Sequence, residues 1–250
     1  MNVVFLGPTL PLEKARALCD AVYLPPARRG DVLAAILEHR PTAIALIDGY
    51  FDQVPSVWHK ELLFALDQGV SVTGAASMGA LRAAELRAFG MIGVGRVFEA
   101  YATGRFSPFD TPFEDDDEVA VAHGPAETGY ASTDAMVDIR ATLANAVEEN
   151  VLTNGAAVDI AAAAKALFYK DRTFARVLAA AAERGMAPAL LEPFRDWLPG
   201  GKVMQKRLDA EQLLRKLDAG SLDGQPPAFR FERTLLWESA VSAPASGDLS

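Results

Sequence analysis

The chain has 250 residues, of which half are hydrophobic and 23% are charged, so it has the composition of a folded protein with a large core. Its net charge of −9 argues against a nucleic-acid binder, which usually carries a basic face. One cysteine, Cys19, excludes a disulfide framework and a cysteine-based zinc cluster, and we expect no metal or other cofactor. No apolar run reaches the ~18 residues of a membrane helix and no basic segment opens the chain, so we expect a cytoplasmic protein without membrane contact.

The first half of the chain alternates short apolar segments with amphipathic ones. Strands are expected at 2–7, 21–25, 43–51, 70–75 and 118–124. Helices are expected at 12–20, 30–40, 54–69 and 78–90, with a helical insertion at 95–106. Strands that are apolar throughout and alternate with helices indicate a parallel sheet covered on both faces. We therefore predict a doubly wound, mostly parallel α/β domain of the Rossmann or flavodoxin-like type over residues 1–128.

The pattern changes in the second half, where long amphipathic segments predict an all-helical region over residues 129–222. The helices are expected at 132–151, 156–169, 173–185 and 202–220. The helix breakers Pro188, Pro193 and Pro199 lie between the last two. Residues 223–250 are expected to form an irregular, partly disordered tail, with one strand or short helix at 229–238.

Polar residues and glycines follow several of the predicted strands. In an open parallel sheet, ligands bind outside the carboxyl ends of the strands, so these corners predict a functional site on one edge. The corners are Gly7-Pro8-Thr9, Asp48-Gly49-Tyr50-Phe51, Gly74-Ala75-Ala76-Ser77 and His123-Gly124-Pro125. The candidate substrate-binding residues near this edge are Gly7, Thr9, Gly49, Tyr50, His59, Gly74, Met78, Gly79 and Arg82.

Ser77 lies between a predicted strand and a predicted helix, with small residues two before and two after it. This spacing matches the nucleophile elbow G-x-S-x-G, with alanine in place of the first glycine. Ser77 could equally be the cap of the helix, accepting a backbone N–H. Gly74 and Gly79 also have the spacing of a phosphate loop, but Ala80-Leu81 stand where that loop needs Lys-Ser/Thr.

A serine nucleophile needs a base, and His123 is the best candidate because it ends a predicted strand on the same edge. Asp48, at a neighbouring strand end, could orient His123 or only cap a turn. His59 could line a pocket or pack against Trp58. Arg82 is expected to pair with Glu85 at i, i+3, although it could reach an anionic substrate.

The acidic run at 114–118 (EDDDE) could bind Mg²⁺ or a basic partner. Consecutive side chains cannot all face one ion, so a solvated turn is the favoured interpretation.

Three long motifs resemble the TfuA-like core, a family named for a trifolitoxin biosynthesis protein. They are LIDGYFDQVPSVWHKELLFAL (46–66), GAASMGALRAAELRAFGMIGVGRVFEAY (74–101) and EDDDEVAVAHGP (114–125). The resemblance covers about residues 1–145.

This resemblance implies an accessory role beside a YcaO-type enzyme, which makes backbone thioamides in peptides such as ribosomally made natural products. Family members are thought to help supply sulfur, either by releasing it from a small thiocarboxylated carrier protein or by docking the donor. The first role implies a hydrolase with Ser77, His123 and Asp48 as candidate catalytic residues. The alternative is a non-catalytic adaptor that binds the YcaO enzyme or recruits the sulfur donor.

Overall fold

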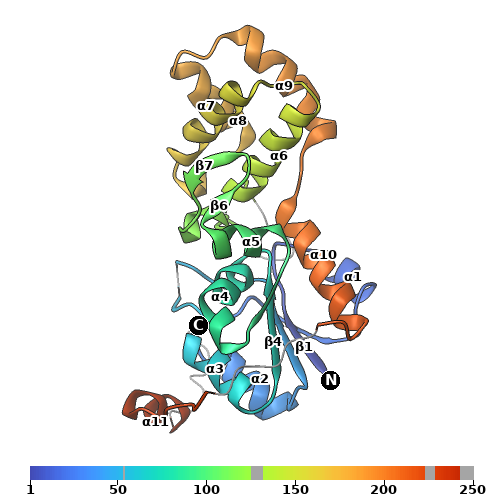
Figure 1. Cartoon of the computed structure of the whole chain (residues 1–250), viewed down its shortest axis with the longest axis vertical. Helices are drawn as coiled ribbons and strands as arrows, with labels where there is room; N and C mark the ends of the chain where they lie inside the picture. Colours follow the sequence, from blue (N-terminus) through green and yellow to red (C-terminus); the bar gives the residue numbers. More distant parts are fainter. Residues whose placement is uncertain (53, 125–131, 223–228, 243–250) are drawn as a thin grey trace.

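The computed structural model describes residues 1–52, 54–124, 132–222 and 229–242. Pro125 of the predicted fourth corner and residues 243–250 of the predicted tail lie outside the described residues. Figure 1 shows an elongated molecule with an α/β part at one end and a group of helices at the other.

The α/β part is built on a five-stranded sheet in which every neighbouring pair is parallel. Its strands are β1 (Asn2–Phe5), β2 (Val22–Leu24), β3 (Ala43–Leu46), β4 (Ser71–Ala75) and β5 (Ile92–Val94). The order β2-β1-β3-β4-β5 is one of the two common doubly wound orders, so the predicted fold class is confirmed. In this order the connections change direction between β1 and β3, which places a crevice at the carboxyl ends of those two strands.

Helices cover both faces of the sheet, as an all-parallel sheet requires. One face packs against α2 (Asp31–His39), α3 (His59–Asp67) and α4 (Met78–Leu86), which is followed by the short 3₁₀ turn η1 (Arg87–Phe89). The other face packs against the short α1 (Leu12–Arg16) and against α10 (Gln205–Asp218) (Figure 1). Ala210, Leu213 and Leu214 of α10 belong to the same apolar cluster as Val4 and Ala75.

The fifth strand is not where the sequence placed it. The prediction of a strand at 118–124 is wrong: η2 (Asp116–Glu118) leads into a segment without strand structure, and the place beside β4 belongs to β5. The apolar residue Val119 packs into the core of the helical part, and its carbonyl accepts a side-chain hydrogen bond from Lys206. The segment is thus held by side chains rather than by pairing with the sheet.

The helical part has its own apolar core. Its elements are α5 (Arg96–Thr103), the antiparallel pair β6 (Arg105–Phe106) and β7 (Phe109–Pro112), α6 (Met136–Glu148), α7 (Asn154–Lys165), η4 (Tyr169–Asp171), α8 (Phe174–Glu183) and α9 (Pro188–Gly201). The expectation that prolines interrupt the chain between α8 and α10 is wrong, because α9 occupies that segment. Pro188 stands at its first position, where a missing N–H costs little.

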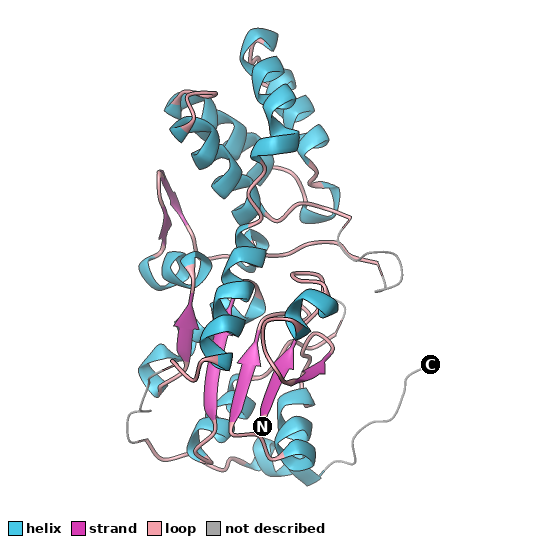
Figure 2. Cartoon of the chain, turned by 90° about the vertical axis from the view of Figure 1, so that its right-hand side faces the viewer, coloured by secondary structure: helices cyan, strands magenta, loops and turns pink. Residues whose placement is uncertain are grey.

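Two elements at the end of the chain return to the α/β part. Helix α10 descends from the helical part along the sheet (Figures 1 and 2). The last helix, α11 (Leu235–Ser242), buries Trp237 against Trp58 and Phe64, so the predicted strand or helix at 229–238 is helical from Leu235. The boundary predicted after residue 128 stays a prediction. None of the helices that the structure describes is long and apolar enough to cross a membrane.

Candidate functional site

A cavity of about 240 Å³ lies at the carboxyl edge of the sheet, where β1 and β3 part. Segments that follow strands form its floor: Pro8 after β1, Asp48–Asp52 after β3, and Ser77 after β4. Its other walls come from Val119–His123, from Tyr169 and Lys170 of the helical part, and from Lys206 of α10. The predicted sheet-edge position therefore holds a real cavity, which the helical part helps to enclose.

Ser77 is the residue that precedes α4, and its side chain lines this cavity. The residue is only 3% exposed. Its hydroxyl makes no capping hydrogen bond to α4. In the first turn of α4, Gly79 N–H donates to the Ile47 carbonyl, and Ala80 and Leu81 N–H donate to the Ser77 carbonyl. Among the described residues the Met78 N–H has no such acceptor, so it is the donor beside Ser77 that could stabilise an oxyanion.

The turn before Ser77 is strained at Ala76, whose φ of 67° is rare for a residue with a side chain. Ser77 itself has φ −125°, so the turn resembles a nucleophile elbow in its strand-to-helix geometry but carries its strain one residue earlier.

Gly74 and Gly79 allow the turn to pack tightly. A Cβ at Gly79 would lie 1.7 Å from the Leu46 carbonyl oxygen, and one at Gly74 would lie 2.1 Å from the Gly79 oxygen. Their spacing is therefore explained by close backbone packing.

The Asp48 carboxylate is buried and holds the loop after β1. Its Oδ2 accepts the N–H groups of Gly7 (2.9 Å) and Thr9 (3.1 Å), and its Oδ1 accepts the Thr9 hydroxyl at 2.5 Å. Asp48 therefore fixes one wall of the cavity through Gly7 and Thr9, whose contact with a substrate stays a prediction.

His123 and Tyr50 lie together in the lining of the cavity, with ring centroids 6.2 Å apart. His123 is exposed, and its Nδ1 lies 3.0 Å from the Gly124 carbonyl oxygen. Gly49 lies beneath them, packed against Met78. The structure thus places Ser77, Asp48 and His123 in the lining of one cavity, at the sheet edge where the sequence predicted them. The roles assigned to them stay predictions.

Lys206 is a buried lining residue that the sequence analysis missed, and Tyr169 and Lys170 were missed as well. Lys206 is 4% exposed, and its Nζ donates to the Val119 carbonyl at 2.8 Å. Burial lowers its pKa, against the opposing effect of the negative charges of Asp48 and Asp138. A signal was present, because Lys206 lies four and seven residues before Ala210 and Leu213, on the buried face of α10.

His59 and Arg82 do not line this cavity. Glu85 joins them, since its Oε2 lies 2.8 Å from His59 Nε2 and 2.6 Å from the Arg82 guanidinium. Arg82 also donates to the Val57 carbonyl at 3.2 Å and to the Ser56 hydroxyl at 3.3 Å, so it ties α4 to the segment before α3. The expected Arg82–Glu85 pair is present, with the arginine buried rather than on the surface.

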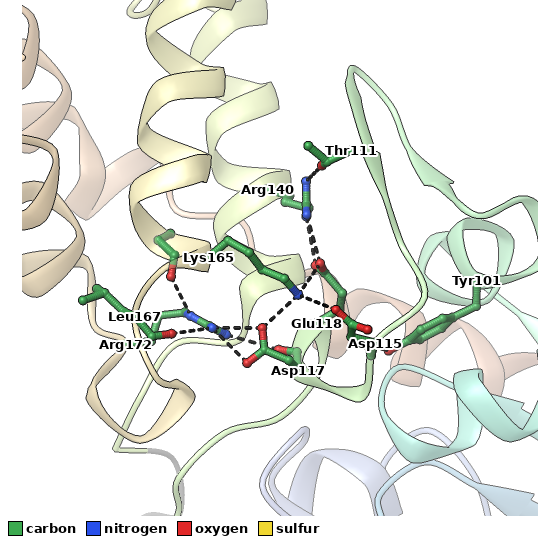
Figure 3. A network of polar contacts seen from close by, with 10 residues as sticks. Tyr101, Thr111, Asp115, Asp117, Glu118, Arg140, Lys165, Leu167 and Arg172 are labelled. Atoms are coloured by element: carbon green, nitrogen blue, oxygen red, sulfur yellow. Dashed lines mark hydrogen bonds and ion pairs between the residues drawn. The ribbon is translucent and has the colours of Figure 1, made fainter. Parts of the chain in front are cut away.

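The acidic run at 114–118 ends in a buried ion-pair network (Figure 3). Glu118 is fully buried and accepts two hydrogen bonds of 2.9 Å from the Arg140 guanidinium and a third from Lys165. Asp117 pairs with Arg172 at 2.9 Å. The favoured solvated turn is therefore wrong for Glu118 and Asp117, whose charges fasten the segment before the cavity to α6 and to the chain around α7.

The arrangement as a whole is a small cavity with a buried hydroxyl, a helix N-terminus and a buried amine. Within the ranges described by the structure, no three His, Cys, Asp or Glu side chains could together hold a metal ion. The cavity volume of 240 Å³ is below the roughly 300–1,000 Å³ of typical ligand and cofactor pockets.

By fold and site, the protein is a doubly wound α/β protein with a candidate functional cavity at the carboxyl ends of β1 and β3, where the connections of the sheet change direction. In a comparison with protein-family models, residues 48–173 match the family described as TfuA-like protein. Because the match spans half of the chain, the protein belongs to the TfuA-like family, as the motifs predicted. The matched range contains Asp48, Ser77 and His123, whereas Lys206 lies beyond it. A search among curated proteins gave no match.

Proposed function

We propose that this protein mobilises sulfur for a YcaO-type enzyme, by hydrolysing the thiocarboxylated C-terminus of a small carrier protein at the Ser77 cavity. The observation that carries the proposal is the position of Ser77, a buried serine whose hydroxyl does not cap its helix and whose side chain lines the cavity. Family membership supports the accessory role in thioamidation, and the chemistry of the cavity supports hydrolysis.

Attack on a thiocarboxyl carbon forms a tetrahedral oxyanion. Donors already aimed at that oxygen lower the barrier because they need no reorganisation during the reaction. The Met78 N–H at the N-terminus of α4 is such a donor beside Ser77. A carrier tail would also fit the size of the cavity, which accepts a few residues of extended chain.

Sulfide release tests this function directly. The purified protein is incubated with a thiocarboxylated carrier protein, and sulfide is measured with a fluorogenic thiol reagent. Ser77→Ala is expected to lower the rate by at least about 1,000-fold, as for other serine nucleophiles. Ser71→Ala is the matched control, because Ser71 begins the same strand at its opposite end. It should keep the parent rate.

Two outcomes would contradict the proposal. If Ser77→Ala releases sulfide as fast as the parent, Ser77 is not the nucleophile. If the parent releases none but binds the YcaO enzyme in a pull-down that survives Ser77→Ala, the protein is an adaptor.

A further inference from the structure

Lys206 stands at the second position of α10, the helix that packs along the sheet (Figure 1). It lines the same cavity as Ser77 and is almost completely buried. Lysines are rarely buried in this way unless they are paired with a carboxylate or serve a function. The burial of the Lys206 amine in this cavity therefore needs a chemical explanation.

The surroundings of the Lys206 amine suit its neutral form. Its described hydrogen bond goes to the Val119 carbonyl, and among the described residues no carboxylate oxygen lies within the 4.0 Å of an ion pair. Asp48 is engaged by the β1 loop, and Asp138 accepts the backbone N–H of Lys206 rather than its amine. An ammonium group would have three N–H donors for that one acceptor, whereas a neutral amine needs fewer partners.

Several other ionisable groups face Lys206 from the elements around it. Across the cavity and an adjoining one of about 30 Å³, they are Asp48, Asp52, His123, Lys170, Asp134, Asp138 and Arg207, together with the phenols of Tyr50 and Tyr169. Asp52 and Lys170 form an ion pair, with 2.7 Å between Asp52 Oδ2 and Lys170 Nζ, so their charges cancel. Burial outweighs the opposing charges of Asp48 and Asp138, so it lowers the pKa of Lys206 below that of an exposed lysine.

We propose that Lys206 is the proton-accepting partner of Ser77, in place of the predicted His123. This inference rests on the proposed function for its substrate. Ser77 and Lys206 line the same cavity, and a serine–lysine pair is one of the known variants of the serine–histidine–aspartate triad. Asp48 then acts as a positioning residue, because it fixes the loop that forms the wall of the cavity.

The proton balance of thiocarboxylate hydrolysis explains why such a partner is needed. As the Ser77 Oγ–carbon bond forms, the hydroxyl proton passes to the Lys206 amine. The carbon–sulfur bond then breaks, and the ammonium returns that proton to the sulfur, which leaves as HS⁻ instead of S²⁻. Water next attacks the Ser77 ester, giving up one proton to Lys206, which passes it to Ser77 Oγ as the carboxylic acid is released.

Two measurements test the pair without the carrier. The first is the rate at which a phosphonofluoridate labels Ser77, followed by intact mass. Lys206→Met and Lys206→Arg are both expected to slow labelling by about 100-fold or more, since general-base catalysis contributes about 10²–10⁴. Lys216→Met, which removes an exposed lysine in the last turn of the same helix, should label at the parent rate.

The second measurement is a pH titration of the Lys206 ¹³Cε resonance in the parent protein, which needs no variant to fold except for assignment. The resonance should titrate below the ordinary lysine pKa of about 10.4. The proposal is overturned if that pKa is ordinary or raised, if Lys206→Arg labels as fast as the parent, or if His123→Ala abolishes labelling while Lys206→Met does not.

Sulfide release by the same proteins separates this inference from the proposed function. Labelling that depends on Lys206 without sulfide release from any protein would support the serine–lysine pair and overturn the substrate. Sulfide release that needs Ser77 but not Lys206 would keep the proposed function and overturn the pair.

Discussion

Removing the charge of Glu118 tests the account of the buried network that supports the cavity. Glu118→Gln keeps the shape of the side chain, but it leaves the Arg140 guanidinium, which is 2% exposed, without its carboxylate. Lys165 is less affected, because it is partly exposed and retains Asp117 at 2.9 Å. Breaking one partner of a buried ion pair costs about 3–5 kcal/mol, so the free energy of unfolding should fall by about that amount.

Urea unfolding followed by circular dichroism measures this loss. Glu114→Gln is the matched control, since Glu114 begins the same acidic run and is exposed; it should change the stability by less than about 0.5 kcal/mol. Replacing the pair together, Glu118→Leu with Arg140→Leu, should recover much of the loss. A loss below about 1 kcal/mol for Glu118→Gln would refute the account, because it would mean that water reaches the pair.

Two further predictions concern packing and pH. Gly79→Ala should destabilise the fold by about 1–3 kcal/mol or more in urea unfolding, because its Cβ would meet the Leu46 carbonyl. The control is Gly155→Ala, at a helix position with open space around it, which should be neutral or stabilising by up to about 1 kcal/mol. Burial raises the pKa of Asp138 to about 6, so its contribution to stability is fully present below the unfolded pKa of about 3.9 and is lost as the pH rises through 6. Between about pH 4 and 7 the parent should therefore lose up to about 3 kcal/mol relative to Asp138→Asn, and parallel stability curves for the two proteins would contradict this burial effect.

The sheet and its functional edge could be predicted because their signals are local. Uninterrupted apolar segments such as 43–47 fit only a strand covered on both sides, and short polar corners follow such strands. Ser77 stood out for the same reason, as the polar residue in a run of small ones between a strand and a helix.

The other half of the cavity could not be predicted because long-range contacts form it. Lys206 stands in a helix that also contains Lys216, and nothing in the local pattern shows that α10 returns to the sheet. The segment after Glu118 has the apolar composition of a strand, but a buried ion pair and the helical core decide its path. The spacing of apolar residues along the chain does not show which distant segments pack together.

The central claim is that sulfur leaves the carrier by acyl transfer to Ser77, and a single-turnover experiment tests it most directly. The protein in excess is mixed rapidly with thiocarboxylated carrier, and sulfide and intact masses are followed together. The account predicts a burst of sulfide accompanied by an adduct of the carrier on Ser77, with both absent in Ser77→Ala. Sulfide formed at the same rate by Ser77→Ala, with no adduct in either protein, would contradict it.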